Sequence, residues 1–258
     1  MRLFLIIDET HFYHPSFVQE LIKKTKHKVV GAGLVTKILP KNNIEYYMIR
    51  NFFYLKISEL LKLATKKLYL KFKNFSTIKK NTDSFYSVRN VFEHFEIDYF
   101  EIENNINQKH YIDKIQMKNP DIIISSNSLI FGDKILKIPK YCINRHSALL
   151  PAYGGLWPVF QAVRKKEEKV GVSIHTMEKK IDKGILLAQK VIKIEEKDTI
   201  DTLYQKCFAC SAQLVLDAIK KIEINNIQPI SNNYIPSYFS FPKKRHWKQF
   251  RKTGIKFI

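Results

Sequence analysis

The stretch of the chain richest in residues that could take part in a reaction begins with Asn144 and His146, in the run NRHSALLPAYGG. Residues two apart in an extended strand point to the same side, so this amide and this imidazole would share one space. An amide N–H can donate a hydrogen bond to a developing oxyanion, and an imidazole can transfer a proton. The pair therefore suits chemistry at a carbonyl group. By itself, however, the spacing also fits a histidine that merely closes a strand.

A carboxylate follows in a second block, GVSIHTMEKKIDKG. Val172 and Ile174 alternate with polar residues and predict a strand, which leads into a polar loop that holds Asp182. A carboxylate there could orient His146 or accept the proton that leaves an amine nucleophile. An Asp-x-Gly alone more often marks a turn. We interpret His175 at the strand end as a structural or positioning histidine rather than a catalyst.

Together the two blocks resemble the folate-dependent formyltransferase family. Its pattern is Asn-x-His, then Ser-x-Leu-Leu-Pro and a Gly, then Gly-Val/Ala-x-x-His-x-Met/Val, then Asp-x-Gly. The resemblance covers about residues 120–187 and is weak over 36–85. Many members carry Pro directly after the catalytic His, where this chain has Ser147, which bears on the subgroup rather than the chemistry. The matching positions are Asn144, His146, Ser147, Leu149, Leu150, Pro151, Gly155, Gly171, His175, Met177, Asp182 and Gly184.

The resemblance implies roles and a co-substrate. Asn144 would hold the formyl oxygen, His146 would stabilise the oxyanion and pass protons, and Asp182 would position the imidazole or a water and help to deprotonate the amine. The formyl donor would be 10-formyltetrahydrofolate, with no metal ion. Its pterin would lie on the loop that precedes the Asn-bearing strand, although the apolar residues of this loop could equally anchor it in the core. The residues expected there are Asn127, Ser128, Leu129, Ile130 and Phe131.

Strand-like and helix-like runs alternate along the chain, which predicts an α/β fold with a Rossmann-like, mostly parallel sheet flanked by helices. Ligands of such sheets bind beyond the carboxyl ends of the strands. Gly31 and Gly33 lack the third glycine of a dinucleotide-binding loop, so we set that reading aside. The expected strands are 2–7, 28–35, 97–102, 121–125 and 141–144, and the expected helices include 16–26 and 199–222.

We expect a catalytic domain over residues 1–222, interrupted by a helical insert at about 40–80, and a C-terminal extension, 223–258, that packs on it. Within the insert, residues 52–72 alternate lysines with Leu and Phe and are too charged to span a membrane. Two interpretations stay open. The helix could pack its apolar stripe on its own domain, or it could lie on an anionic membrane surface.

Charge and cysteines set further bounds. The formal net charge of +20 suits anionic partners, although it also fits lysines spread over a solvated surface. Cys142, Cys207 and Cys210 predict no disulfide framework, and the last two fall in a helical run without a zinc-spaced partner pair. The apolar run 3–7 is too short for a signal peptide or a membrane span, so we expect a cytoplasmic protein.

The acceptor amine is the least determined feature. Too little chain follows Asp198 for the C-terminal barrel of methionyl-tRNA enzymes, and the tail from Ser237 resembles that of sugar formyltransferase-like proteins. The leading hypothesis is a nucleotide-linked amino sugar for surface polysaccharide, with no nucleic-acid partner; a homodimer is compatible with the sequence. Alternatives are another amine (a tRNA-bound aminoacyl group or a glycinamide ribonucleotide), or a non-catalytic folate- or nucleic-acid-binding protein. The candidate acceptor-binding residues are Tyr153, Gly154, Trp157 and Trp247, although the basic, aromatic tail could also simply pack on the core.

Overall fold

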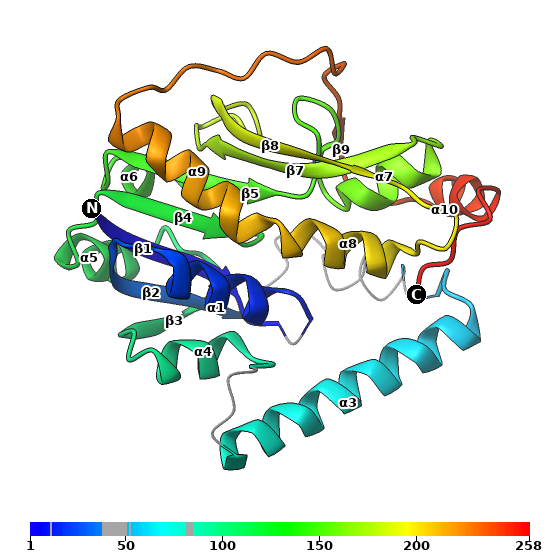
Figure 1. Ribbon diagram of the computed structural model, residues 1–258, viewed down its shortest axis with the longest axis horizontal. Coiled ribbons are helices and arrows are strands. Elements are labelled where there is room, and N and C mark those ends of the chain that lie inside the picture. Colours follow the sequence, from blue (N-terminus) through cyan, green and yellow to red (C-terminus); the bar gives the residue numbers. More distant parts are fainter. Residues whose placement is uncertain (11, 38–50, 52, 81–84) are drawn as a thin grey trace.

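The computed structural model describes residues 1–10, 12–37, 51, 53–80 and 85–258. Seven strands form one sheet in the order β3-β2-β1-β4-β5-β7-β8 (Figure 1). The first five are parallel, whereas β7 runs antiparallel to β5 and β8 antiparallel to β7. The predicted mostly parallel α/β sheet is confirmed. The strands are β1 (Arg2–Asp8), β2 (Lys28–Lys37), β3 (Tyr99–Glu103), β4 (Ile122–Ser126), β5 (Tyr141–His146), β7 (Lys169–Thr176) and β8 (Leu186–Lys193).

Helices cover both faces of this sheet, and the alternation of side chains along β1 explains how. Leu3, Leu5 and Ile7 enter one core, and Phe4 and Ile6 enter the other, as expected of a central strand buried on both sides. Residues of α1 (His14–Lys24), α4 (Val88–His94), α8 (Ile200–Ala209) and α9 (Ser211–Glu223) complete the first core. Residues of α5 (Lys109–Met117) and α6 (Asp133–Leu136) complete the second.

The helix expected at 199–222 is two helices, which meet at Cys210. The hydroxyl of Ser211 donates to the carbonyl oxygen of Cys207 at 2.7 Å and accepts from Nε of Arg145 at 2.9 Å. The Ser211 hydroxyl thus binds a carbonyl oxygen in the last turn of α8, where it competes with the backbone for that acceptor, and it also satisfies the buried guanidinium of Arg145. Cys207 is buried within α8 as expected, whereas Cys210 is half-buried and lies at the junction of the two helices.

The C-terminal segment returns to the part of the chain that follows β5. β9 (Tyr238–Phe239) pairs with β6 (Gly154–Gly155), and α10 (Lys244–Arg251) packs against α7 (Pro158–Arg164). Trp247 and Phe250 are the buried residues of α10. The tail therefore reaches the segment that follows the Asn-x-His strand.

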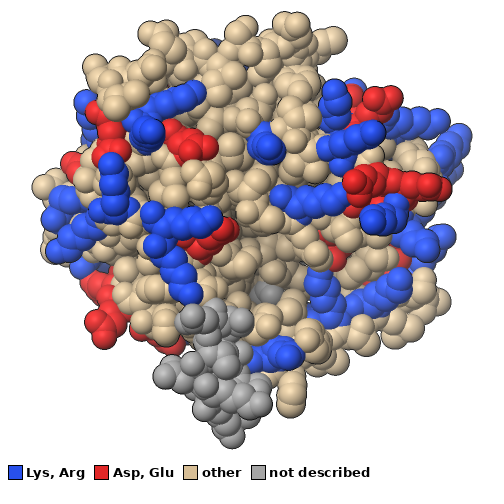
Figure 2. Space-filling model, in the orientation of Figure 1, with Lys and Arg blue, Asp and Glu red and all other residues tan. Residues whose placement is uncertain are grey.

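The predicted inserted helix corresponds to α3 (Ile57–Lys80), which runs along the outside of the molecule (Figure 1). No helix in the part of the chain that the structure describes is long and apolar enough to cross a membrane. Lys and Arg side chains are spread over the face drawn in Figure 2, with fewer acidic ones among them.

Candidate active site

Asn144 and His146 end β5 at the carboxyl edge of the sheet. In the antiparallel register with β7, Asn144 lies opposite His175 and His146 lies opposite Ser173. Between them, Arg145 donates to Ser211 and stacks its guanidinium 3.6 Å from the centre of the Phe208 ring. The middle residue therefore turns into the helical layer, whereas its two neighbours share the other side of the strand.

His175 fixes the orientation of the Asn144 amide. Its Nδ1 lies 2.8 Å from the carbonyl oxygen of Thr176, which can only accept, so Nδ1 carries the proton. Nε2 is then an acceptor and lies 3.3 Å from Nδ2 of Asn144. Burial lowers the pKa of His175 below its usual range, which keeps the ring neutral. His175 thus takes one of the two N–H groups of the Asn144 amide. The prediction of a positioning histidine agrees with this geometry.

Asp182 lies between the two histidines. Its Oδ1 is 3.6 Å from Nε2 of His175, and its Oδ2 is 3.8 Å from Nε2 of His146. Oδ2 also accepts the backbone N–H of Gly155 at 2.7 Å. Asp182 has a φ of 55°, in the left-handed region that Asp tolerates better than most residues. The carboxylate is thus held from the β6 side while its own backbone is strained, as is common at functional sites.

Gly184 allows the loop of Asp182 to close. A Cβ at this position would stand 1.7 Å from the carbonyl oxygen of Thr176. The Asp-x-Gly spacing is therefore a steric requirement of the return from β7 to β8, in addition to its place in the site.

Burial lowers the pKa of His146 below its usual range, and the nearby Asp182 carboxylate opposes this shift. Nε2 of His146 also lies 3.4 Å from the carbonyl oxygen of Tyr153. Since both neighbours of Nε2 are acceptors, that nitrogen carries the proton of the neutral ring. The site thus presents amide and imidazole N–H donors beside one carboxylate. This set can stabilise negative charge on an oxygen and accept a proton from an amine.

The loop after β4 is shaped by Asn127. Its Nδ2 donates to the carbonyl oxygen of Ile6 at 2.9 Å, and its Oδ1 accepts from the backbone of Leu129 at 2.8 Å. Ile130 is 67% exposed, whereas Phe131 is buried in the second core. Of the five residues expected at the pterin, Phe131 thus anchors the loop with its side chain. Ser128 turns its hydroxyl to Asp8 at 3.2 Å.

Most side chains expected at the acceptor face inward. The Tyr153 ring is buried, stacks on Phe239 and donates its hydroxyl to Glu167. Trp247 is only 3% exposed and donates its Nε1 to Asn51 at 2.7 Å. Its ring is surrounded by Trp157, Phe160, Phe250 and Phe257. Trp247 therefore offers no ring face to a ligand, contrary to our expectation. Gly154 is buried beside Asp182 and Trp157 is half-buried.

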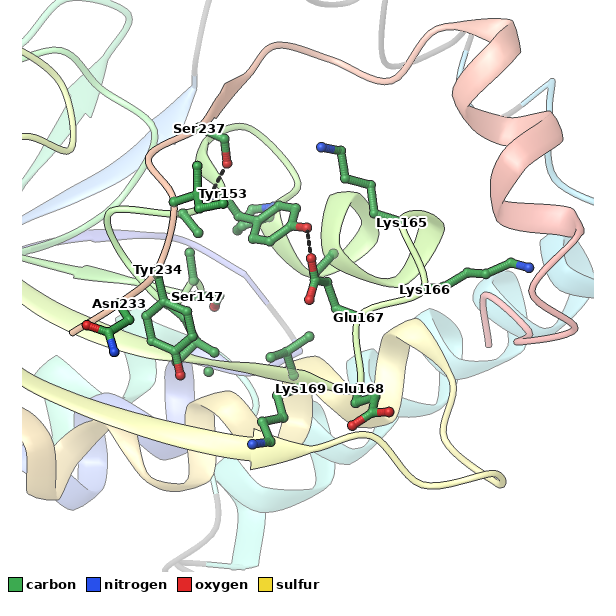
Figure 3. A pocket seen from close by; sticks show the side chains of 18 residues that line it. Ser147, Tyr153, Lys165, Lys166, Glu167, Glu168, Lys169, Asn233, Tyr234 and Ser237 are labelled. Atoms are coloured by element: carbon green, nitrogen blue, oxygen red, sulfur yellow. Dashed lines mark hydrogen bonds between the residues drawn. The ribbon is translucent and has the colours of Figure 1, made fainter.

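A cavity of about 570 Å³ lies next to this region and does not include Asn144, His146 or Asp182 in its lining (Figure 3). It is bounded by the segment 147–153, the end of α7 and the tail residues 233–237. Ser237 of the tail accepts the backbone N–H of Tyr153 at 2.9 Å, so the tail is bonded directly to the segment 147–153 that follows β5.

Two residues at the site were not found from the sequence. Asp8 ends β1, where burial raises its pKa to about 7, and its Oδ1 has no hydrogen-bond partner among the described residues. Its only signal was that it ends an apolar run. Tyr238 is 55% exposed; the burial of its hydroxyl raises its pKa, and the nearby Asp182 carboxylate raises it further. A Cβ on Gly155 would stand 3.1 Å from Cζ of Tyr238, so the ring lies on this glycine. Nothing local in the sequence placed Tyr238 here.

The model of the formyl transferase family matches residues 75–219, which is more than half of the chain and contains all three residues of the site. The chain belongs to the formyl transferase family. The expectation drawn from the Asn-x-His and Asp-x-Gly blocks is thereby confirmed at the level of the family.

Among curated relatives of this family member, methionyl-tRNA formyltransferase of Thermotoga neapolitana is 34% identical over 125 residues, or 48% of this chain and 40% of the relative. The bifunctional polymyxin resistance protein ArnA of Wigglesworthia glossinidia brevipalpis is 40% identical over 156 residues, or 58% of this chain and 22% of the relative. The chain thus spans less than half the length of these relatives.

Solved structures share the fold. Phosphoribosylglycinamide formyltransferase from Anaplasma phagocytophilum superposes with a TM-score of 0.61 at 13% identity, covering 93% of this chain and 98% of the other. A sugar N-formyltransferase from a Shewanella species gives 0.57 at 19% identity, covering 93% and 77%. At such identities the likeness shows the formyltransferase fold alone.

Proposed function

We propose that this protein transfers a formyl group from 10-formyltetrahydrofolate to the primary amine of an acceptor. The observation that carries the proposal is the convergence of Asn144, His146 and Asp182 at the carboxyl edge of the sheet in a chain of the formyl transferase family. An amide N–H already held by His175, an imidazole and a carboxylate are the groups that formyl transfer to an amine needs.

Each residue of this trio has a distinct part in the proposed reaction. Asn144 donates the N–H that does not bond to His175 to the formyl oxygen as that oxygen gains negative charge. His146, held near Asp182 and the Tyr153 carbonyl, supports the same charge and moves a proton. Asp182 accepts the proton of the attacking amine, directly or through His146. Because Gly155 and His175 hold these groups before any ligand binds, little reorganisation is needed during the reaction.

The residues present fit a pterin between two facing loops. The loop 127–131 presents the exposed Ile130, and the loop that leads to Asp182 presents Ile181, which is 44% exposed. An ion pair of 3.8 Å joins Lys179, in the loop that leads to Asp182, to Asp133, the first residue of α6. A flat ring with hydrogen-bonding edges, such as a pterin, binds well where exposed apolar side chains lie next to backbone N–H and carbonyl groups. In this proposal Asn127, Ser128, Leu129 and Ile130 hold the formyl donor, which supplies the activated one-carbon group.

The acceptor that we propose is a nucleotide-linked amino sugar. The exposed ring of Tyr238 beside Asp182 supports it, because such a ring can stack on a sugar or a base at the point where the amine must lie. The large positive net charge favours a phosphorylated acceptor. In the proposal Tyr238 thus replaces Trp247 as the aromatic contact of the tail.

A second candidate acceptor is an aminoacyl group on tRNA. The observation that favours it is the identity of 32–34% with methionyl-tRNA formyltransferases of Thermotoga. The positive charge of the chain fits this polyanion equally well. The two acceptors differ in size and charge and are easily distinguished by experiment.

The deciding experiment offers the protein 10-formyltetrahydrofolate with a panel of nucleotide-linked amino sugars, methionyl-tRNA and glycinamide ribonucleotide. We expect an amino sugar to gain the mass of one CO group, and His146→Asn protein to give no gain. Formylation of methionyl-tRNA alone would select the second acceptor. No transfer to any amine, with the folded protein present, would refute the function. Tyr238→Ala should raise the KM of the nucleotide sugar more than it changes kcat.

A further inference from the structure

The helix α3 is attached to the rest of the protein through polar side chains. Three residues on one side of the helix, at intervals of seven and eight, bond to partners on α10, α8 and α4. Two of these contacts are ion pairs in which both charges are at least partly buried. The pairs are Glu59 with Arg251 at 2.6 Å, Lys66 with Asp201 at 2.6 Å, and Asn74 with Asn90 at 3.0 Å.

The opposite side of α3 is an exposed apolar stripe. Ile57, Leu61, Leu68 and Phe72 follow one another at intervals of four, seven and four residues, so they share one face of the helix. Their exposed fractions lie between 62% and 78%. The stripe is roughly 22 Å long at the rise of an α-helix. A soluble helix ordinarily turns such a stripe to its own core, and α3 does the reverse. Of the two interpretations drawn from the sequence, packing of the apolar stripe on its own domain does not hold for these four residues.

Cations flank the stripe on both sides. On a helical projection, Lys62 and Lys73 fall on one side of it and Lys67 and Lys71 on the other, and all four are exposed. The helix holds seven lysines and one acid, Glu59, which is buried and paired with Arg251. An apolar stripe bordered by lysines, without exposed acid, matches the interfacial region of an anionic bilayer. There the apolar side chains reach the acyl chains and the lysines meet lipid phosphates.

We propose that the outer face of α3 is a peripheral docking surface for an anionic lipid bilayer. The polar attachment through Glu59, Lys66 and Asn74 fixes the orientation of the helix, so the stripe is presented outward before any lipid is met. A second copy of the chain is a poorer occupant, because pairing two such faces would place lysine rows against each other in a protein of net charge +20. The helix lies on the membrane without spanning it. This proposal is independent of the acceptor and of the formyl-transfer activity.

Vesicle flotation tests it with the full chain. We expect the protein to float with vesicles of phosphatidylcholine mixed with phosphatidylglycerol and to stay behind with vesicles of phosphatidylcholine alone. Leu68→Gln combined with Phe72→Gln should reduce the partition coefficient by about tenfold or more, since these side chains supply much of the buried apolar area. Lys67→Gln combined with Lys71→Gln should weaken binding by a smaller factor that shrinks as salt rises. The matched control is Met117→Gln combined with Ile224→Gln, because these residues are 76% and 63% exposed on other elements.

A tryptophan probe reports position independently of affinity. Phe72→Trp should shift its emission to shorter wavelength when anionic vesicles are added, whereas Met117→Trp should not. Failure of the wild-type protein to float with anionic vesicles would overturn the proposal, as would equal loss of binding in the Met117/Ile224 control. If Leu68→Gln/Phe72→Gln instead converts a dimer to a monomer in sedimentation, the face is an interface between copies and the proposal is wrong. Circular dichroism and formyl transfer, which do not involve these residues, verify that each variant is folded.

Discussion

Nδ2 of Asn144 lies 3.3 Å from Nε2 of His175, directly across the antiparallel pair of β5 and β7. Because the other nitrogen of this ring faces the Thr176 carbonyl, His175 has one tautomer available and can only accept from the amide. A buried ring thereby decides which way the Asn144 amide faces, and in the proposed function this amide binds the formyl oxygen.

The first prediction tests this positioning role. His175→Ala should lower kcat by about ten- to a hundredfold, since a misplaced catalytic group costs rate, with little change in the KM of either substrate. His175→Gln keeps an acceptor in reach of Asn144 and should recover part of the loss. A variant Asn144→Ala should be no worse when His175→Ala is added. If the two substitutions instead lower kcat by independent factors that multiply in the double variant, His175 does not act through Asn144.

A second prediction separates the chemistry from the basic tail. His146→Asn should lower kcat by about a hundred- to ten-thousandfold, because the amide can neither carry the proton nor become cationic. Neutralising Lys243, Lys244, Arg245 and Lys248 should instead raise the KM of a phosphorylated acceptor, with an effect that fades at high salt. Steady-state kinetics at two salt concentrations distinguish the two. Wild-type turnover by the His146→Asn enzyme would show that the site has been assigned wrongly.

The third prediction concerns pH. Burial lowers the pKa of His146 and Asp182 raises it, and burial is the larger cause. A lowered pKa means that the ring takes up a proton only at a pH below its usual range. Activity that needs the neutral ring should therefore persist into mildly acidic solution and fall at lower pH. Asp182→Asn removes the opposing charge, so the titration of His146 should move to still lower pH. Histidine NMR, with His146→Asn for assignment, measures this without relying on turnover, and a shift to higher pH would contradict it.

The sequence predicted the central part of this site because the chemistry there is local. Asn144 and His146 are two apart on one strand, and Asp182 is held by a loop whose closure requires Gly184. Both blocks are short and contiguous, so their residue types reveal their arrangement. The five parallel strands were likewise visible, because buried parallel strands are continuous apolar runs.

What the sequence did not reveal depends on contacts between distant segments. Tyr238 reaches Asp182 only because β9 pairs with β6, more than eighty residues earlier in the chain. Trp247 is of a residue type that often contacts ligands, yet the aromatic cluster around α7 and α10 buries it. Asp8 directly follows an apolar run in the sequence, and its environment is set by Ser128 on another strand's loop. Periodicity in one segment carries no information on such partners.

A fourth prediction concerns Asp8 and stability. Burial raises its pKa to about 7 in the folded protein, against 3.8 ordinarily. The folded state therefore binds this proton more tightly than the unfolded chain. The cost of the buried carboxylate is absent below about pH 4, grows as pH rises, and is complete above about pH 7. Asp8→Asn should raise the melting temperature at pH 8, and the gain over wild type should shrink at pH 5. Thermal melts at both pH values measure this. A gain in melting temperature that is larger at pH 5 than at pH 8 would contradict the prediction.

The last prediction concerns Gly155, which links the tail to the Asp182 carboxylate. Its φ is +90°, and a Cβ there would stand 2.2 Å from the backbone oxygen of Phe239. Gly155→Ala must therefore separate β6 from β9 and move the N–H that Asp182 accepts at 2.7 Å. We expect a loss of about 2–4 kcal/mol in the free energy of unfolding, from backbone strain plus the clash.

Gly254→Ala is the matched control for that variant. Gly254 also has a positive φ, of 78°, but a Cβ there would meet nothing within 4 Å. The Gly254→Ala variant should therefore lose only about 1–2 kcal/mol of unfolding free energy, from the strained backbone alone, and keep its kcat. Gly155→Ala should additionally lose kcat, because the carboxylate is no longer held toward His146. Urea unfolding and steady-state kinetics on both variants measure the difference. Equal losses of stability together with an unchanged rate in Gly155→Ala would mean that the tail does not hold Asp182 in place.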